Sequence, residues 1–421
     1  MSGRRAIKLG TLAVALVLVL AACGGASTDG GASTSTPSAD PTTTVPGSGQ
    51  SSTTTPSDGG DTSELSFSVA DGWTAVALGP GVKPALALDP SGSPAVTWLF
   101  EAIGEGFVAF AESSDNWTVE TLIEGYFYGP IGLAYDPAGT PNVVIHDHQA
   151  DNFDPQLGDL VRLFRDGSGW TADVASDDGH DGWDSTVAIG DDGVIHAAGV
   201  DPVQFGSSDG VEYYVNTGTG WEVSQIGSGP IPYQYNVALA VDGAGSPSLA
   251  YYDANEGDLV FGHLVDGSWS LERVAEEGDV GKYSSLAYDA EGRPALTFFR
   301  QTGATEGEVV FAVRSDRAWT TETVGSLGAF SEDNARRNSS LAFDSQGRAH
   351  VVFSDTEGVW YSIRGDAGWE TQQIVEAGLT LGQLVSLAID GSDRPHIAIY
   401  EVTEIQPLDG VVAYITTDVS G

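Results

Sequence analysis

The chain has 421 residues, with 59 acidic and 17 basic side chains and a formal net charge of −42 at pH 7. A negative field of this size repels phosphate backbones, which excludes nucleic acid as a partner and disfavours direct binding to anionic lipid headgroups. Hydrophobic residues make up 41% of the chain, enough for a sizeable core, and the single cysteine excludes an internal disulfide.

The first 22 residues have the features of an export signal. Arg4, Arg5 and Lys8 precede an apolar run, Leu12 to Leu20, that is too short to span a bilayer as a mature helix. The run ends in Leu20-Ala-Ala-Cys23, which resembles the lipobox of bacterial lipoproteins. The resemblance implies lipidation of Cys23 and anchoring of an exported protein to the outer face of a bacterial membrane. An ordinary secretory signal with an incidental cysteine is the alternative.

Residues 23–64 are expected to be a disordered tether. Almost all of them are Gly, Ala, Ser, Thr, Pro, Asp or Gln. Such a segment cannot bury enough apolar area to offset the entropy lost on ordering. We therefore expect one folded domain, over residues 65–421.

From residue 65 onward the sequence repeats itself about every fifty residues, a spacing typical of propellers and solenoids. Each repeat begins with Leu-Ala-x-Asp, continues through a turn that usually contains Gly, and leads into a second alternating segment. This is the pattern of a β-hairpin. Two further strands follow, and the last of them carries a tryptophan. The repeats start at Leu86, Leu133, Leu239, Leu286, Leu341 and Leu387, with a degenerate copy at Val187.

The tryptophans set the number of blades. Trp73 precedes the first repeat, whereas the last repeat runs through Val411 to Ile415 and stops before its own fourth strand. The segment around Trp73 is therefore predicted to complete the last blade and close the ring, which removes the exposed edges of an open array. We predict an all-β, seven-bladed β-propeller of four-stranded blades. The seven fourth-strand tryptophans are Trp73, Trp117, Trp170, Trp221, Trp269, Trp319 and Trp369.

The repeat resembles that of secreted prokaryotic propellers, which are loosely grouped with sialidase-like propellers of the BNR type. The nearest copies are Arg394-Pro-His-Ile-Ala-Ile-Tyr400 and Gly347-Arg-Ala-His-Val-Val-Phe353. The resemblance covers nearly all of residues 65–421. It implies the architecture and no single activity, because propellers carry many functions.

Candidate site residues gather at the ends of the second strands. In a propeller, the loops that leave these ends and the loops that join the blades share one face, here named the channel-mouth face. Carboxylates and aromatic rings there suit sugar hydroxyls and sugar faces, and equally a cationic peptide or a metal ion. The alternative is that each acid accepts hydrogen bonds in its own turn. The predicted ligand-binding residues are Glu101, Asp147, Asp201, Asp253, Arg300, Asp355 and Glu401, with the aromatic residues Tyr252, Tyr400, Trp183 and Tyr283.

No metal site is assigned, although Ca²⁺ is a candidate cofactor. The cluster around His146-Asp147-His148 lacks a third fixed ligand. The stretch from Asp177 to Asp184 lacks the acid at the third position and the terminal Glu of a calcium-binding loop.

A glycoside hydrolase is the enzymatic alternative. Sialidase-like enzymes need three arginines that converge on a carboxylate. Here only Arg300, Arg336 and Arg337 are expected near the channel mouth. A pair of carboxylates could still hydrolyse a glycosidic bond. The other arginines are expected on third strands (Arg162, Arg165, Arg314, Arg364) or in the first hairpin on the opposite face (Arg293, Arg348, Arg394).

The sequence thus favours a monomeric, surface-anchored and non-catalytic module that binds an extracellular glycan, protein or cation. No catalytic residue is assigned. A glycosidase and a structural protein of the cell envelope are the other two hypotheses.

Overall fold

The computed structural model describes residues 53–54, 65–100, 106–113, 116–125, 127–147, 158–176, 182–204, 207–227, 237–304, 306–316, 318–327, 339–376, 384–404 and 409–417. The predicted signal peptide, Cys23 and all of the tether except Thr53 and Thr54 lie outside them. The described residues form strands and turns, and they include no helix that could cross a membrane.

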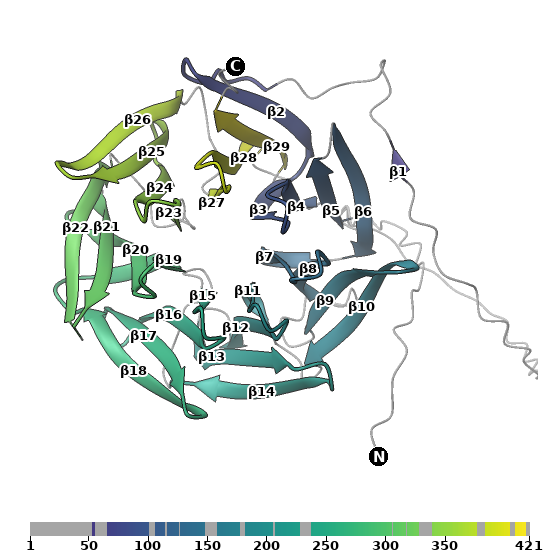
Figure 1. Ribbon diagram of the computed structural model, residues 1–421, viewed down its shortest axis with the longest axis horizontal. Coiled ribbons are helices and arrows are strands. Elements are labelled where there is room, and N and C mark those ends of the chain that lie inside the picture. The colour runs from purple at the N-terminus through teal and green to yellow at the C-terminus, as the bar shows by residue number, and fades with distance from the viewer. Residues whose placement is uncertain are drawn as a thin grey trace, which may run out of the picture. The chain divides into compact units, whose positions relative to one another are not determined.

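Seven antiparallel sheets stand around a central axis as the blades of a propeller (Figure 1). Each blade has four strands, and the short β1 (Thr53–Thr54) adds to the outer edge of blade 1. The fold predicted from the repeats is confirmed.

In blades 1 to 6 the four strands run in chain order from the central axis outward. In blade 7 the outermost strand, β2, comes from the start of the domain. Blades 1 and 2 contain β3 (Val82–Leu88), β4 (Pro94–Phe100), β5 (Gly106–Ser113), β6 (Trp117–Gly125), β7 (Phe127–Tyr135), β8 (Pro141–Asp147), β9 (Asp159–Asp166) and β10 (Gly169–Ser176). Blades 3 and 4 contain β11 (Trp183–Ile189), β12 (Ile195–Gln204), β13 (Ser207–Asn216), β14 (Trp221–Ile226), β15 (Ala238–Val241), β16 (Pro247–Asp253), β17 (Asp258–Val265) and β18 (Ser268–Ala275). Blades 5 and 6 contain β19 (Val280–Tyr288), β20 (Pro294–Gln301), β21 (Gly307–Ser315), β22 (Ala318–Leu327), β23 (Ser339–Phe343), β24 (Ala349–Ser354), β25 (Gly358–Gly365) and β26 (Gly368–Glu376). Blade 7 contains β27 (Ser386–Ile389), β28 (Pro395–Glu404), β29 (Asp409–Thr417) and β2 (Trp73–Pro80).

Blade 7 closes the ring with strands from both ends of the folded domain. β2 pairs with β29 from Trp73 opposite Thr417 to Pro80 opposite Val411. The chain then passes directly into β3 of blade 1. This is the closure that the position of Trp73 predicts.

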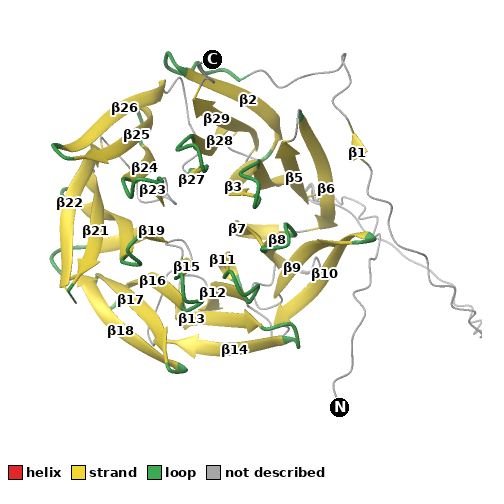
Figure 2. Cartoon of the chain, in the orientation of Figure 1, coloured by secondary structure: helices red, strands yellow, loops and turns green. Residues whose placement is uncertain are grey.

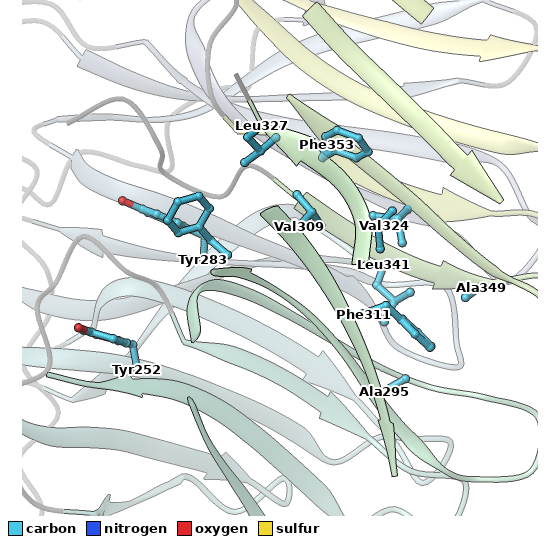
Figure 3. Packing of buried hydrophobic residues seen from close by; sticks show 12 residues of the cluster. Tyr252, Tyr283, Ala295, Val309, Phe311, Val324, Leu327, Leu341, Ala349 and Phe353 are labelled. Atoms are coloured by element: carbon cyan, nitrogen blue, oxygen red, sulfur yellow. The ribbon is translucent and has the colours of Figure 1, made fainter. Parts of the chain in front are cut away.

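The core lies between neighbouring blades. Side chains of the second and third strands are buried on both faces of each sheet, as in β4 and β8. Figure 3 shows one such cluster, in which Phe311 of blade 5 and Phe353 of blade 6 take part. Full burial of one such side chain contributes about 1.5–3 kcal/mol. Because the propeller contains no cysteine, packing of this kind carries its stability.

The fourth-strand tryptophans fasten each blade to the one before it. In six of the seven blades the indole ring lies 4.8–5.4 Å, centre to centre, from an aromatic ring on the third strand of the preceding blade. Five of the pairs are edge-to-face and Trp117–Tyr414 is tilted, and aromatic contacts of this kind add to the energy of burial. The predicted packing role of these tryptophans is confirmed. The pairs are Trp73–Tyr361, Trp117–Tyr414, Trp170–Phe110, Trp269–Tyr213, Trp319–Phe261 and Trp369–Phe311.

Candidate functional site

The turns between the first and second strands define one face of the ring, here named the turn face (Figure 2). In each of six blades the Asp of Leu-Ala-x-Asp closes its own turn. The Oδ1 of Asp89, for example, accepts the N–H groups of Ser91 and Ser93 at 2.8 Å. The same two bonds recur at Asp136, Asp242, Asp289, Asp344 and Asp390. These aspartates are therefore structural, as the repeat predicts.

In blades 6 and 7 a buried histidine lies beneath the turn that the Asp closes. His350 donates from Nε2 to Asp344 at 3.0 Å and accepts from the Tyr361 hydroxyl at Nδ1. His396 likewise accepts from the Tyr414 hydroxyl at Nδ1, and its Nε2 lies 3.3 Å from an Asp390 carboxylate oxygen. Burial lowers the pKa of both histidines, so they are neutral at pH 7. Burial raises the pKa of Asp344, but hydrogen bonds from His350 and Arg348 outweigh it and bring that pKa to about 2. These groups are all engaged with one another.

The predicted column of acids lies at the opposite face, at the ends of the second strands. Glu101 and the side chain of Asp201 are outside the described residues. Asp253 accepts the Asn255 N–H at 3.0 Å. Asp355 accepts the N–H groups of Glu357 and Gly358 and the indole N–H of Trp360. Asp253 and Asp355 thus make the turn-closing bonds of the structural alternative.

Asp147 ends β8, opposite Asp159 of β9. Two carboxylates that face each other across a strand pair repel one another unless other groups compensate their charge. A ligand role for Asp147 and for the other acids of the column stays a prediction.

Glu401 holds the segment that enters the propeller, residues 65–70, here named the strap. The Ser66 N–H donates to Glu401 at 3.0 Å, and the Ser66 hydroxyl donates to the other carboxylate oxygen. Further along, Val69 pairs with Val375 of β26, and the apolar residues of the strap pack between blades 6 and 7. Glu401 is 5% exposed. Its carboxylate is therefore occupied by the strap.

The aromatic residues are less accessible than the sequence predicts. Tyr252, Tyr283 and Tyr400 are all buried. Trp183 is half-buried, and its ring lies 5.0 Å from that of His146. The expectation of exposed rings at the three tyrosines is wrong, because strands between two neighbouring blades are covered on both faces. In such a strand, the alternation of side chains between the two faces of the sheet does not show which of them reach solvent.

Bulges interrupt the innermost strands close to the channel mouth. The register between first and second strands shifts between Val82 and Ala85, between Trp183 and Thr186, and between Lys282 and Ser285. At these mouth bulges the chain is left-handed at residues other than glycine, with φ of 58° at Lys83, 52° at Asp184 and 58° at Tyr283. Such backbone costs about 1–3 kcal/mol per residue, and it concentrates at functional sites.

Blade 5 brings several polar groups together at its mouth end. Asp279 accepts from the Tyr252 hydroxyl at 2.8 Å and from Lys282 Nζ at 2.9 Å. Lys282 Nζ also lies 5.3 Å from the centre of the Tyr252 ring. On the next strand, Arg300 Nη2 donates to Glu308 at 2.6 Å. The β19–β20 register sets Val280 opposite Arg300 and Lys282 opposite Phe299. We name Tyr252, Asp279, Lys282, Arg300 and Glu308 the blade-5 mouth cluster.

The cluster contains one acceptor and one donor side chain that are partly exposed to solvent. The side chains of Asp279 and Arg300 are 37% and 35% exposed, whereas that of Lys282 is 4% exposed. Sequence reasoning selected Tyr252 and Arg300 but missed Asp279, Lys282 and Glu308. A signal was present, because lysine occurs only three times in the chain, at Lys8, Lys83 and Lys282.

Most other described arginines pair with acids elsewhere in the ring. Arg165, Arg314 and Arg364 lie on third strands and bind Glu120, Glu272 and Glu322 of the preceding blades. Arg293 and Arg348 bind Asp289 and Asp344 on the turn face. The predicted positions of these arginines are confirmed, and the described ones do not converge on one point. Arg336 and Arg337 lie outside the described residues.

The two loops that the sequence offers as candidate metal sites lie partly outside the described residues. Within the described residues, no three His, Cys, Asp or Glu side chains come together as a metal site. His148 and residues 177–181, which belong to the two candidate loops, lie outside them.

The comparisons with known proteins bear on the architecture. No protein-family model matches this sequence, and no curated protein is similar enough to count as a relative. Among solved structures, a polysaccharide lyase named PL25 ulvan lyase is 13% identical, with a TM-score of 0.53, over 80% of this chain and 94% of that one.

Two further structures match with lower TM-scores. A lectin of Aleuria aurantia in complex with α-methyl-L-fucoside is 14% identical, with a TM-score of 0.45, over 76% of this chain and 100% of that one. The NanB sialidase of Streptococcus pneumoniae is 11% identical, with a TM-score of 0.43, over 80% of this chain and 68% of that one. At these identities the likeness shows the fold alone.

Proposed function

We propose that this protein is an exported, lipid-anchored binding module whose channel-mouth face recognises an extracellular glycan. The propeller presents the ligand-binding face, residues 23–64 form the tether, and Cys23 carries the lipid. A non-catalytic role is part of the proposal, and it is supported by the arginines of the third strands and the turn face, which pair with acids that join blades or close turns.

The blade-5 mouth cluster is the observation that carries the proposal. Sugar hydroxyls both donate and accept hydrogen bonds, so a site for them needs partly exposed donors and acceptors side by side. Arg300 and Asp279 are each partly exposed, and their backbones are adjacent, because the Gln301 N–H donates to the Asp279 carbonyl at 3.2 Å. The bonds to Tyr252, Lys282 and Glu308 hold both side chains in place before a ligand arrives, which reduces the entropy lost on binding.

The fold gives secondary support. The structural neighbour with a TM-score of 0.53 is named for its action on a polysaccharide. The overall charge of −42 also favours ligands other than nucleic acids.

A glycan-binding screen with the purified protein tests the proposal, followed by product analysis of every glycan bound. We expect saturable binding without products. Arg300→Ala is expected to weaken it about tenfold to a hundredfold, because a charged donor contributes about 1.5–3 kcal/mol. Arg394→Ala, which removes an arginine from the turn face, is the control and keeps full affinity. Released products would make the protein a glycosidase or lyase, and no binding to any glycan would overturn the proposal.

The anchor has its own test. Cys23→Ala is expected to move the protein from the membrane fraction to the medium or periplasm. Unchanged membrane association of this variant would contradict the lipid anchor and leave the glycan proposal intact.

A further inference from the structure

We propose that two copies of this chain pair through the outer edge of β2 in blade 7, so that the two blades form one continuous antiparallel sheet. β2 (Trp73–Pro80) is the outermost strand of its blade, and β29 pairs with its inner edge (Figure 1). Its outer edge pairs with no described strand, and such an edge is a template for a strand of another chain. The dimer differs from the monomer that the sequence favours, and it is independent of the proposed function.

β2 differs in charge from the outer strands of the other six blades. Its eight residues include no acidic or basic side chain, whereas each of the other six strands carries at least one acid. Charged side chains on an edge strand protect it against pairing with another chain, so β2 lacks a protection that the other blades have. The acids are Glu120 and Glu124 in β6, Asp173 in β10, Glu222 in β14, Glu272 in β18, Glu322 in β22, and Glu370 and Glu376 in β26.

The outer edge of blade 1 shows that a further strand fits at this position of the ring. β1, from the predicted tether, pairs antiparallel with β6, with Thr53 opposite Glu120 and Thr54 opposite Val119. Both residues of β1 are uncharged, so they meet the acid of β6 without repulsion between like charges. An outer edge of this propeller therefore accepts an added antiparallel strand.

A second copy fits the edge of β2 because an antiparallel strand pair can be self-complementary. β2 keeps its register with β29 from Trp73 to Ala77, and a bulge follows. A two-fold axis at Ala75, perpendicular to the sheet, sets Thr74 of one copy opposite Val76 of the other. No charge meets a like charge in this pairing, although the whole chain has a net charge of −42. The same pairing through any other outer strand brings the acids of two copies onto adjacent strands.

The exposed side chains of β2 support the same occupant. Thr74 and Val76 lie on one face of the strand, both are exposed, and the exposed fraction of Val76 is 43%. In the joint sheet, Val76 of each copy contacts Thr74 of the other, which removes apolar surface of both valines from water. An interface of this small size is expected to give a weak dimer, with a dissociation constant in the micromolar range.

Sedimentation velocity over a range of protein concentrations tests the proposal. Every protein also carries Cys23→Ala, so that neither a lipid nor a thiol can join two copies. Val76→Glu places like charges on adjacent strands and is expected to weaken dimerisation about tenfold or more. Val223→Glu is the matched control, because Val223 is 46% exposed on β14, the outer strand of blade 3. This control keeps the wild-type dissociation constant.

A charge swap separates pairing from a folding defect. Val76→Glu and Val76→Lys each repel their own copy, whereas a mixture of the two forms a heterodimer, because opposite charges then lie on adjacent strands. Hydrogen–deuterium exchange of the protein without changes in β2 gives a second measurement. Exchange over residues 73–77 is expected to slow as the protein concentration rises, and exchange in β14 is expected to stay the same.

A protein that stays monomeric at every concentration would overturn the inference. So would a dimer that Val76→Glu leaves intact, because that dimer forms through another surface. A mixture of the two Val76 variants that stays monomeric, or exchange over residues 73–77 that does not depend on concentration, contradicts the inference as well. Each of these results leaves the proposed function standing.

Discussion

The turn face and the channel-mouth face of the propeller are built from the same repeat, yet they use their polar residues differently. On the turn face, each Asp side chain closes a short turn whose bonds recur from blade to blade, and the histidines below it are neutral and paired. On the channel-mouth face, the blades differ from one another. The mouth bulges hold Lys83, Asp184 and Tyr283 in left-handed backbone, and Arg300 stands in a column that is otherwise acidic.

This contrast separates residues that maintain the ring from residues that are free to vary. A bond copied into every blade serves what every blade needs, which is a closed hairpin. A residue found in one blade alone serves something that happens once per molecule, such as ligand binding. Arg300 is of the second kind, because acids hold its position in the other blades, as Asp253 does in the neighbouring blade 4.

The largest expected effect is the loss of a turn-face aspartate. Asp344→Ala removes the acceptor of the Gln346 and Arg348 N–H groups, of Arg348 Nε and of His350. We expect the free energy of unfolding to fall by about 3 kcal/mol, because one buried donor and three partly buried donors lose their acceptor. Asp253→Ala on the channel-mouth face, which removes one exposed turn bond, is expected to cost about 0.5 kcal/mol. Urea denaturation of both variants measures the difference, and equal losses would break the contrast between the faces.

The second largest expected effect is a loss of protein stability in mild acid, caused by the buried histidines beneath the turn face. Burial lowers the pKa of His196, His350 and His396, so they stay neutral in the fold. The unfolded chain takes up protons below about pH 6.5, so stability falls as the pH drops from 7 to 5. The contribution of Asp344, whose pKa is about 2, is retained until the pH falls below about 4 and is lost towards pH 2.

Denaturation at pH 7 and pH 5 measures this loss. His396→Gln is expected to reduce the pH dependence, since it removes one of the buried histidines with a lowered pKa. A stability that does not change between these two pH values would contradict the neutral state of the buried histidines.

The smallest expected effect is on the contact between the strap and blade 7, at the channel-mouth face. Ser66→Ala and Glu401→Gln each remove part of one contact. In a double-mutant cycle we expect a coupling energy of about 1 kcal/mol, typical of hydrogen bonds to a carboxylate. Glu401→Gln should leave glycan affinity unchanged. A loss of affinity without coupling to Ser66 would show that Glu401 binds ligand, as the sequence predicts.

Much of the fold could be predicted because its determinants are local and repeated. The Leu-Ala-x-Asp turns fixed the hairpins, and the offset between Trp73 and the incomplete last repeat indicated the closure now seen between β2 and β29. The sequence also placed Arg300 at the channel mouth. These inferences needed only the period of the repeat and the chemistry of a turn.

The rest of the site depends on contacts that no local pattern reveals. At Tyr283 a register shift separates the residue from the alternation of its strand, so its ring lies in the core. The pairing of Ser66 with Glu401 joins residues 335 positions apart. Lys282 and Asp279 belong to an inter-blade loop and the strand that follows it, outside the conserved shape of the repeated hairpin. The only sequence signal for the blade-5 mouth cluster is that lysine occurs just three times in the chain and that Lys282 is one of the three.

The most direct test of the central claim is hydrogen–deuterium exchange of the protein with and without a saturating glycan found in the screen. The account predicts added protection in peptides over residues 279–284 and 299–308, at the mouth of blade 5. It predicts none in the turn-face peptides over residues 289–293 and 344–348. Protection confined to the turn face, or spread evenly over both faces, would contradict the assignment of the channel-mouth face as the binding surface.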